Sequence, residues 1–320
     1  MKFITVTTPQ YLSDLPHWMG KISRNQSFMI KTNQRSEEWY KLRNTLAITA
    51  SEVSTLLGQN PFMTRNNFYK EKMIEKLVEI GVSREGLCDN WSDNKKYPTD
   101  NNNTDTSYKE RMQKWGIDME ETAINIASYL LDEDIKPSGL FIDHGITGLI
   151  GASPDGIITD QNDDLSAIVE CKCPFNQQIY KNINANKIPV YHYIQIQTQL
   201  MVTKAPFAWY VIYIPTCCTI YKIERDAPTW RMIDKAIDDL HKHVYIEVNN
   251  FIDCSNVLQI YKLQVPGRYR DKSRIGSEII DNMEKHVTRL GEWGIDEKVK
   301  LTKEERDNLE ALYGDNPEEK

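Results

Sequence analysis

One stretch, Gly148–Phe175, constrains the fold more than any other part of the chain. Two short runs of β-branched or apolar residues, Ile157–Thr159 and Ala167–Cys171, flank the polar segment Asp160–Asp164. Short apolar runs separated by a polar break are typical of a β-hairpin. The stretch therefore predicts two antiparallel strands joined by a tight connection.

Strand geometry then predicts which side chains meet. Successive residues of a strand point to opposite faces, so Glu170 and Lys172 are expected on one face and Val169 and Cys171 on the other. Asp155 lies in a Ser-Pro-Asp-Gly turn at the mouth of the first strand. Two carboxylates and an ammonium group can thus converge on one spot.

Such a trio suits metal-assisted chemistry on a phosphate ester. Mg²⁺ usually takes one or two protein carboxylates and completes its shell with water and substrate phosphate. A bound metal lowers the pKa of its water, and a neighbouring lysine can position or deprotonate that water. The alternative is an exposed hairpin in which Glu170 and Lys172 form a simple surface pair.

The same stretch resembles the lambda-exonuclease or YqaJ-like viral recombinase branch of the PD-(D/E)xK nucleases. The matching residues are Ser153-Pro154-Asp155-Gly156 and Glu170-Cys171-Lys172-Cys173-Pro174. The resemblance implies that Asp155 and Glu170 bind metal, with help from the Cys171 carbonyl, and that Lys172 serves the attacking water. It also implies an α/β fold, a central mixed sheet with helices on both sides.

A second segment, Gln34–Gly58, is similar to the same branch. Ser36 predicts the start of one helix, and the sequence Ile-Thr-Ala-Ser at 48–51 leads into another that ends near Gly58. In the branch, the arginine and serine at the positions of Arg43 and Ser51 hold the terminal 5′-phosphate of DNA. Arginine suits bidentate phosphate contacts, and helix N-termini attract anions. The alternative is a helix-capping Ser51 beside a solvated Arg43.

A strong helical pattern covers Glu110–Leu131. Glu120 falls on its otherwise apolar stripe, where a carboxylate needs a partner. The branch has a Trp-Gly-x-x-x-Glu helix whose glutamate helps to hold the metals, and Glu120 matches it. Glu121 lies off the stripe and is expected to be dispensable.

Further helices are predicted at Thr64–Ile80, Val190–Thr203 and Thr229–Asn249, and a buried strand at Ala208–Ile214. The sequence Gln-Ile-Gln at 195–197 is similar to the branch's Gln-x-Gln motif, whose first glutamine lies beside the lysine and water. Gln195 is therefore the candidate catalytic residue, and Gln197 and His192 are alternatives.

Composition fits a globular protein inside a cell, in the cytoplasm or nucleus of a host. No apolar run approaches a membrane span, and six cysteines without a framework spacing indicate reduced thiols. The net charge of −7 neither supports nor excludes DNA, because affinity for nucleic acid depends on a local basic groove.

Three regions are expected along the chain. They are an N-terminal arm at 1–34, a nuclease domain at 35–250 with an exposed loop at 84–107, and a mainly helical C-terminal extension at 251–320. Within the extension, Ser277–Trp293 and Thr302–Tyr313 have helical patterns. Its role does not follow from the sequence.

Together these motifs predict a Mg²⁺-dependent deoxyribonuclease, with Mn²⁺ as an alternative ion and two ions per site. The resemblance implies a 5′-to-3′ exonuclease of double-stranded DNA ends that makes single strands for viral recombination. It also implies an annealing partner and a homo-oligomer, by resemblance a trimer. The cysteine spacing argues against an iron–sulfur cluster. The alternatives are an endonuclease of the same fold and a catalytically silent DNA-end-binding scaffold.

Overall fold

A computed structural model describes residues 4–7, 28–79, 106–143, 150–176, 188–246 and 272–295. Several predictions fall wholly or largely outside these residues: the polar loop at 84–107, most of the N-terminal arm, and the helix at Thr302–Tyr313. Among the described helices, none combines the length and the apolar character needed to cross a bilayer.

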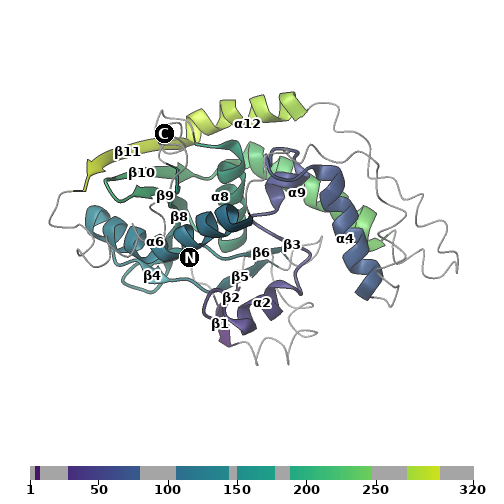
Figure 1. Ribbon diagram of the computed structural model, residues 1–320, viewed down its shortest axis with the longest axis horizontal. Helices are drawn as coiled ribbons and strands as arrows, with labels where there is room; N and C mark the ends of the chain where they lie inside the picture. The colour runs from purple at the N-terminus through teal and green to yellow at the C-terminus, as the bar shows by residue number, and fades with distance from the viewer. Residues whose placement is uncertain are drawn as a thin grey trace, which may run out of the picture.

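The described strands form two mixed sheets rather than the single central sheet that was predicted (Figure 1). The five-stranded sheet has the order β1-β2-β5-β6-β3, with β1 at Ile4–Thr7, β2 at Phe28–Lys31, β5 at Leu140–Asp143, β6 at Ile150–Ala152 and β3 at Ile48–Thr49. The six-stranded sheet has the order β11-β10-β9-β8-β7-β4, with β11 at Val287–Gly294, β10 at Cys217–Glu224, β9 at Phe207–Ile214, β8 at Leu165–Lys172, β7 at Gly156–Thr159 and β4 at Lys136–Pro137.

The chain crosses from one sheet to the other at the Ser-Pro-Asp turn. Strand β6 ends at Ala152 and β7 begins at Gly156, so only Ser153–Asp155 separate the two sheets. The predicted hairpin is confirmed, because β7 and β8 pair antiparallel with Gly156 opposite Val169. Asp155 is thereby fixed at the junction of the two sheets.

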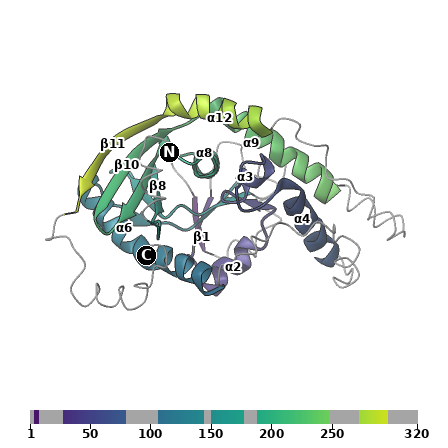
Figure 2. The same cartoon turned by 45° about the horizontal axis from the view of Figure 1, so that its top comes forward.

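The described helices are α2 (Glu37–Arg43), α3 (Val53–Leu56), α4 (Arg65–Glu79), α6 (Thr106–Leu131), α8 (Val190–Thr203), α9 (Ala227–Leu240), the π-helix η1 (His241–Ile246) and α12 (Lys272–His286). Helix α6 packs on β8, β9 and β10. Helix α8 contacts β9 of one sheet and both β5 and β6 of the other, and Figure 2 shows it end-on in the middle of the molecule. It is buried along most of its length, which explains its apolar and β-branched composition.

The C-terminal prediction is wrong over part of its length. Ser277–Trp293 was expected to be one helix, but α12 ends at His286 and β11 follows directly. Strand β11 pairs antiparallel with β10 and completes one side of the six-stranded sheet. An open strand edge offers unpaired backbone groups, and that tertiary pairing overrides a weak local helical pattern. Gly291 and Gly294 in the segment also disfavour helix.

A buried polar network holds the start of α9. Asp226 is the N-cap of this helix and is completely buried. Its carboxylate accepts hydrogen bonds from the Thr229 backbone N–H at 3.1 Å, from the Thr229 hydroxyl and from the Tyr193 hydroxyl of α8 at 3.0 Å. This network ties α9 to the central helix.

Asp226→Ala should therefore destabilise the protein by about 3 kcal/mol, since it removes a cap and leaves buried donors unpaired. Urea denaturation followed by circular dichroism measures the loss. Asp238→Ala, which removes a 37% exposed aspartate of the same helix that pairs with Lys242, should leave the midpoint nearly unchanged. Equal midpoints for the two variants would contradict the role of the network.

Candidate active site

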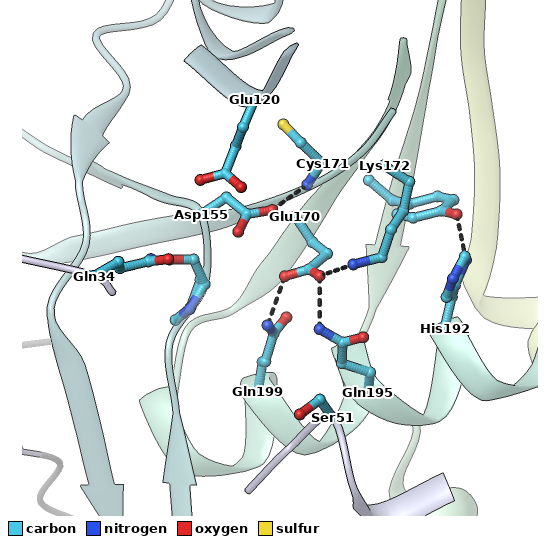
Figure 3. A network of polar contacts seen from close by, with 12 residues as sticks. Gln34, Ser51, Glu120, Asp155, Glu170, Cys171, Lys172, His192, Gln195 and Gln199 are labelled. Atoms are coloured by element: carbon cyan, nitrogen blue, oxygen red, sulfur yellow. Dashed lines mark hydrogen bonds and ion pairs between the residues drawn. The ribbon is translucent and has the colours of Figure 1, made fainter. Parts of the chain in front are cut away.

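The centre of the site is the carboxylate of Glu170, near the end of β8. Its side chain is only 2% exposed. Gln195 donates to one oxygen at 2.6 Å and Gln199 to the other at 2.7 Å, both from α8 (Figure 3). The ammonium group of Lys172 forms an ion pair with the same carboxylate. A buried carboxylate is thus held by one cation and two amides.

Strand alternation places these groups as predicted. Glu170 and Lys172 lie on the face of β8 that meets α8, whereas Val169 and Cys171 join the apolar cluster under α6. Burial raises the pKa of the Cys171 thiol well above its usual value. The Cys171 side chain is therefore a neutral packing group, and any part in the site falls to its backbone.

Asp155 reaches the same spot from the turn between the sheets. Its carboxylate accepts a hydrogen bond from the Cys171 backbone N–H at 2.7 Å, so the predicted convergence is confirmed. Burial, and then the charge of Glu170, raise the pKa of Asp155 well above its usual range. Glycine is required at position 156, directly after the turn, because an added Cβ would lie 2.4 Å from a side-chain carbon of Ile135. The turn thus holds the Asp155 carboxylate close to that of Glu170 on β8, at an electrostatic cost.

Lys172 remains a cation in this arrangement. Burial disfavours its charged form, but the negative charges of Glu170 and Asp155 outweigh that effect and raise the pKa of Lys172 above its ordinary value. In this state the lysine donates hydrogen bonds and offsets negative charge.

Glu120 approaches from α6. Its carboxylate forms an ion pair with Arg35 and contributes to the raised pKa of Asp155. The side chain is half-buried beside the apolar face of the helix, and Glu121 is exposed as predicted. Among the α6 side chains that the structure describes, the buried ones are Trp115, Met119, Ala123, Ile126 and Ala127, so Glu120 borders this face. The partner that a carboxylate needs in such a place is an arginine.

Arg43 and Ser51 lie together on the other side of the site. The Arg43 guanidinium donates to the Thr49 hydroxyl at 3.0 Å and to the Ser51 hydroxyl at 3.2 Å, and it lies 5.0 Å from the centre of the Trp39 ring. The N-cap of α3 is Glu52 rather than Ser51. The alternative of a capping serine beside a solvated arginine is therefore wrong.

Sequence analysis missed two residues of the site. Gln199 is one helical turn after Gln195, so the spacing could have identified it. Arg35 gave no periodic signal, because its contact with Glu120 spans 85 positions. Of the two alternatives on α8, Gln197 donates to the Glu224 backbone carbonyl and accepts from the Asp226 backbone N–H and the Trp230 indole N–H. His192 bonds to the Tyr210 hydroxyl.

A cavity of about 140 Å³ lies between the Arg43–Ser51 pair and the two glutamines that bind Glu170. Its lining includes Arg35, Arg43 and Ser51 together with Gln195 and Gln199. Basic groups and the amides that bind Glu170 therefore face one space. Within the described ranges, no three His, Cys, Asp or Glu side chains gather closely enough to form a complete metal-ligand cluster by themselves.

Comparison with known proteins places this geometry in a family. The YqaJ-like viral recombinase domain matches residues 38–206, more than half of the chain, and that segment carries the carboxylates, the lysine and the glutamines. The chain belongs to the YqaJ-like viral recombinase family. A sequence comparison with curated proteins finds no match.

This YqaJ-like chain is similar to several solved structures, and it shares the fold of the first. A structure of LHK-Exo in complex with dAMP has 21% sequence identity and a TM-score of 0.50, with 69% of this chain and 98% of that chain covered. A second structure of LHK-Exo, an alkaline exonuclease from Laribacter hongkongensis, has 21% identity, a TM-score of 0.49 and the same coverage. A phage-related exonuclease from Haemophilus somnus 129PT has 12% identity and a TM-score of 0.39, with 65% of this chain and 96% of that chain covered.

The hydrogen bond from Gln199 predicts a measurable stability effect. Gln199→Leu removes a donor from a buried carboxylate, so it should lower the free energy of unfolding by about 1–3 kcal/mol. Gln199→Glu keeps the shape but adds a like charge, so it should cost more. Urea denaturation measures both, with Gln113→Leu, exposed on α6, as the control. A Gln199→Leu variant as stable as this control would show that the bond contributes nothing.

Proposed function

We propose that this YqaJ-like protein is a divalent-cation-dependent exonuclease that degrades double-stranded DNA from its ends, 5′ to 3′. The single observation that carries the proposal is the shared cavity. Arg43 and Ser51 line it together with Gln195 and Gln199, the two amides bound to Glu170. A terminal phosphate held by the first pair would place the neighbouring phosphodiester near the carboxylates.

The donor set fits Mg²⁺, with Mn²⁺ as a substitute. Burial, and then the charges of Glu170 and Glu120, raise the pKa of Asp155, and a divalent cation beside these carboxylates would offset their negative charge. In this proposal these carboxylates and the Cys171 carbonyl would hold the ions, two per site. When bound, such ions supply water of lowered pKa and offset charge on the phosphoryl oxygens.

The residues around the carboxylates would position the substrate and the attacking water. Protonated Lys172 would donate a hydrogen bond to the water or to a phosphoryl oxygen, which stabilises charge that develops during displacement. Gln195 and Gln199 would keep Glu170 in one orientation, so that its oxygens stay directed toward the reaction centre. Arg43 would contact the terminal phosphate through its fork of N–H groups.

The proposed biological role is the production of single strands for viral recombination. That role calls for double-stranded DNA ends as the substrate and for an annealing protein as a later partner. It also includes assembly into a homo-oligomer, a trimer by family resemblance. Gel filtration with light scattering tests the assembly, and a monomeric mass would contradict it.

The proposed reaction predicts a strict dependence on DNA ends. Purified protein with Mg²⁺ should remove one strand of linear duplex DNA carrying 5′-phosphate, act at least about tenfold more slowly on 5′-hydroxyl ends, and leave covalently closed circles intact. Arg43→Ala should abolish the preference for phosphate, and Lys172→Ala should lower the rate by at least about 100-fold. Gel electrophoresis of end-labelled DNA measures each rate. Equal cutting of closed circles would indicate an endonuclease, and no cutting with Mg²⁺ or Mn²⁺ would favour a silent scaffold.

The two adjacent glutamates of α6 provide a matched pair of variants. Glu120→Gln removes a charge beside Asp155, so it should raise the Mg²⁺ concentration needed for half-maximal activity and slow the reaction by about tenfold or more. Glu121→Gln removes the same charge from an exposed position and should change neither quantity. Mg²⁺ titration of the initial rate compares them. Identical titration curves would exclude Glu120 from the site.

A further inference from the structure

Arg35 is held in an unusual backbone conformation beside the carboxylates. Its φ is +64°, in the left-handed region that residues other than glycine rarely adopt. The residue is the third of a turn that is closed by a hydrogen bond from Ser36 N–H to the Asn33 carbonyl. Glycine or asparagine usually takes this position of such turns. A long cationic side chain is therefore retained where a smaller residue would be less strained.

Neighbouring contacts fix this turn against the catalytic turn. Gln34 donates to the Pro154 carbonyl at 2.7 Å, and the indole N–H of Trp39 donates to the Ser153 hydroxyl at 3.3 Å. Both acceptors directly precede Asp155 in the chain. Arg35 is thus presented by a backbone that is anchored to the Ser-Pro-Asp turn on either side of it.

The guanidinium of Arg35 still has groups free to bind a ligand. One of its nitrogens pairs with Glu120, and the side chain is 38% exposed in the wall of the cavity. Its hydrogen bond to Glu120 engages one terminal nitrogen of the fork. The fork of five N–H donors in arginine matches the oxygens of a phosphate group.

Electrostatics gives a reason for a second arginine in this place. A phosphodiester that approaches Asp155, Glu170 and Glu120 is repelled by three carboxylates. Lys172 is already paired with Glu170, and Arg43 is bonded to Thr49 and Ser51. Arg35 is bound to Glu120 and lines the same cavity. It can therefore neutralise Glu120 and attract a phosphate with one side chain.

We propose that Arg35 contacts an internal phosphate of the bound DNA strand, next to the terminal phosphate, and that Glu120 holds its guanidinium in place. The inference rests on the proposed function, since it takes DNA as the ligand. The Arg35 contact differs from the proposed Arg43 contact, because it does not depend on whether the DNA end carries a phosphate. Arg35 is thereby a substrate-binding residue and Glu120 its positioning partner.

The test is equilibrium binding without hydrolysis. Fluorescence anisotropy of a short labelled duplex in EDTA, with 5′-phosphate or 5′-hydroxyl ends, is measured over a range of salt concentrations. Arg35→Ala should weaken binding by about tenfold for both ends and reduce the slope of log affinity against log salt by about one. Arg43→Ala should weaken binding to the 5′-phosphate end alone. Lys41→Ala, which removes an exposed cation of α2 paired with Glu37, is the control. It should change neither the affinity for either DNA end nor the salt slope.

Further variants separate this role from a purely structural one. Arg35→Gly should lose binding as Arg35→Ala does, yet melt at a higher temperature than Arg35→Ala, because glycine tolerates the left-handed backbone. Arg35→Lys keeps the charge without the fork and should restore part of the affinity.

Two results would overturn the assignment: unchanged affinity in Arg35→Ala for both ends, or a loss confined to 5′-phosphate ends. Failure of the proposed exonuclease would appear separately, as a wild-type protein that binds duplex DNA but does not hydrolyse linear DNA with Mg²⁺.

Discussion

A buried carboxylate at the end of β8 is the constraint on which the rest of this structure depends. Glu170 is 2% exposed, so its charge must be matched by nearby donors. Gln195 and Gln199 meet that need from α8, and Lys172 from the same strand. Helix α8 must therefore lie close against the strand, and it occupies the centre of the molecule between the two sheets. The need of Glu170 for hydrogen-bond donors therefore helps to fix the position of the central helix.

The site also depends on where the chain changes sheets. Only Ser153–Asp155 separate β6 from β7, and the turn between them is fixed by Gln34 and Trp39. Asp155 is thus placed opposite β8 by backbone geometry rather than by a flexible loop. The raised pKa of Asp155 records the cost of this arrangement, because the second carboxylate is partly buried and lies near Glu170. Perturbed pKa values of this kind are common at functional sites.

Local patterns predicted the parts of the site well. The alternation of β8 correctly separated Glu170 and Lys172 from Cys171, and helical spacing located α6 and α8 within a few residues. Prediction failed where a distant partner decided the outcome. Residues Val287–Trp293 became a strand because β10 offers an open edge, and Arg35 joined the site through a contact 85 positions away. Periodicity carries no information about such partners.

The sequence by itself determined the hairpin, the pairing of Glu170 with Lys172 on one face, and the helices that carry Glu120 and Gln195, because all of these follow from periods of two or 3.6 residues. Only the tertiary structure decided that two sheets, rather than one, meet at the Ser-Pro-Asp turn. It also decided that Arg35, Arg43 and the glutamines of α8 face one cavity. The physical reason is that burial and charge pairing act between segments far apart in the chain, and their balance is set only when the segments pack together.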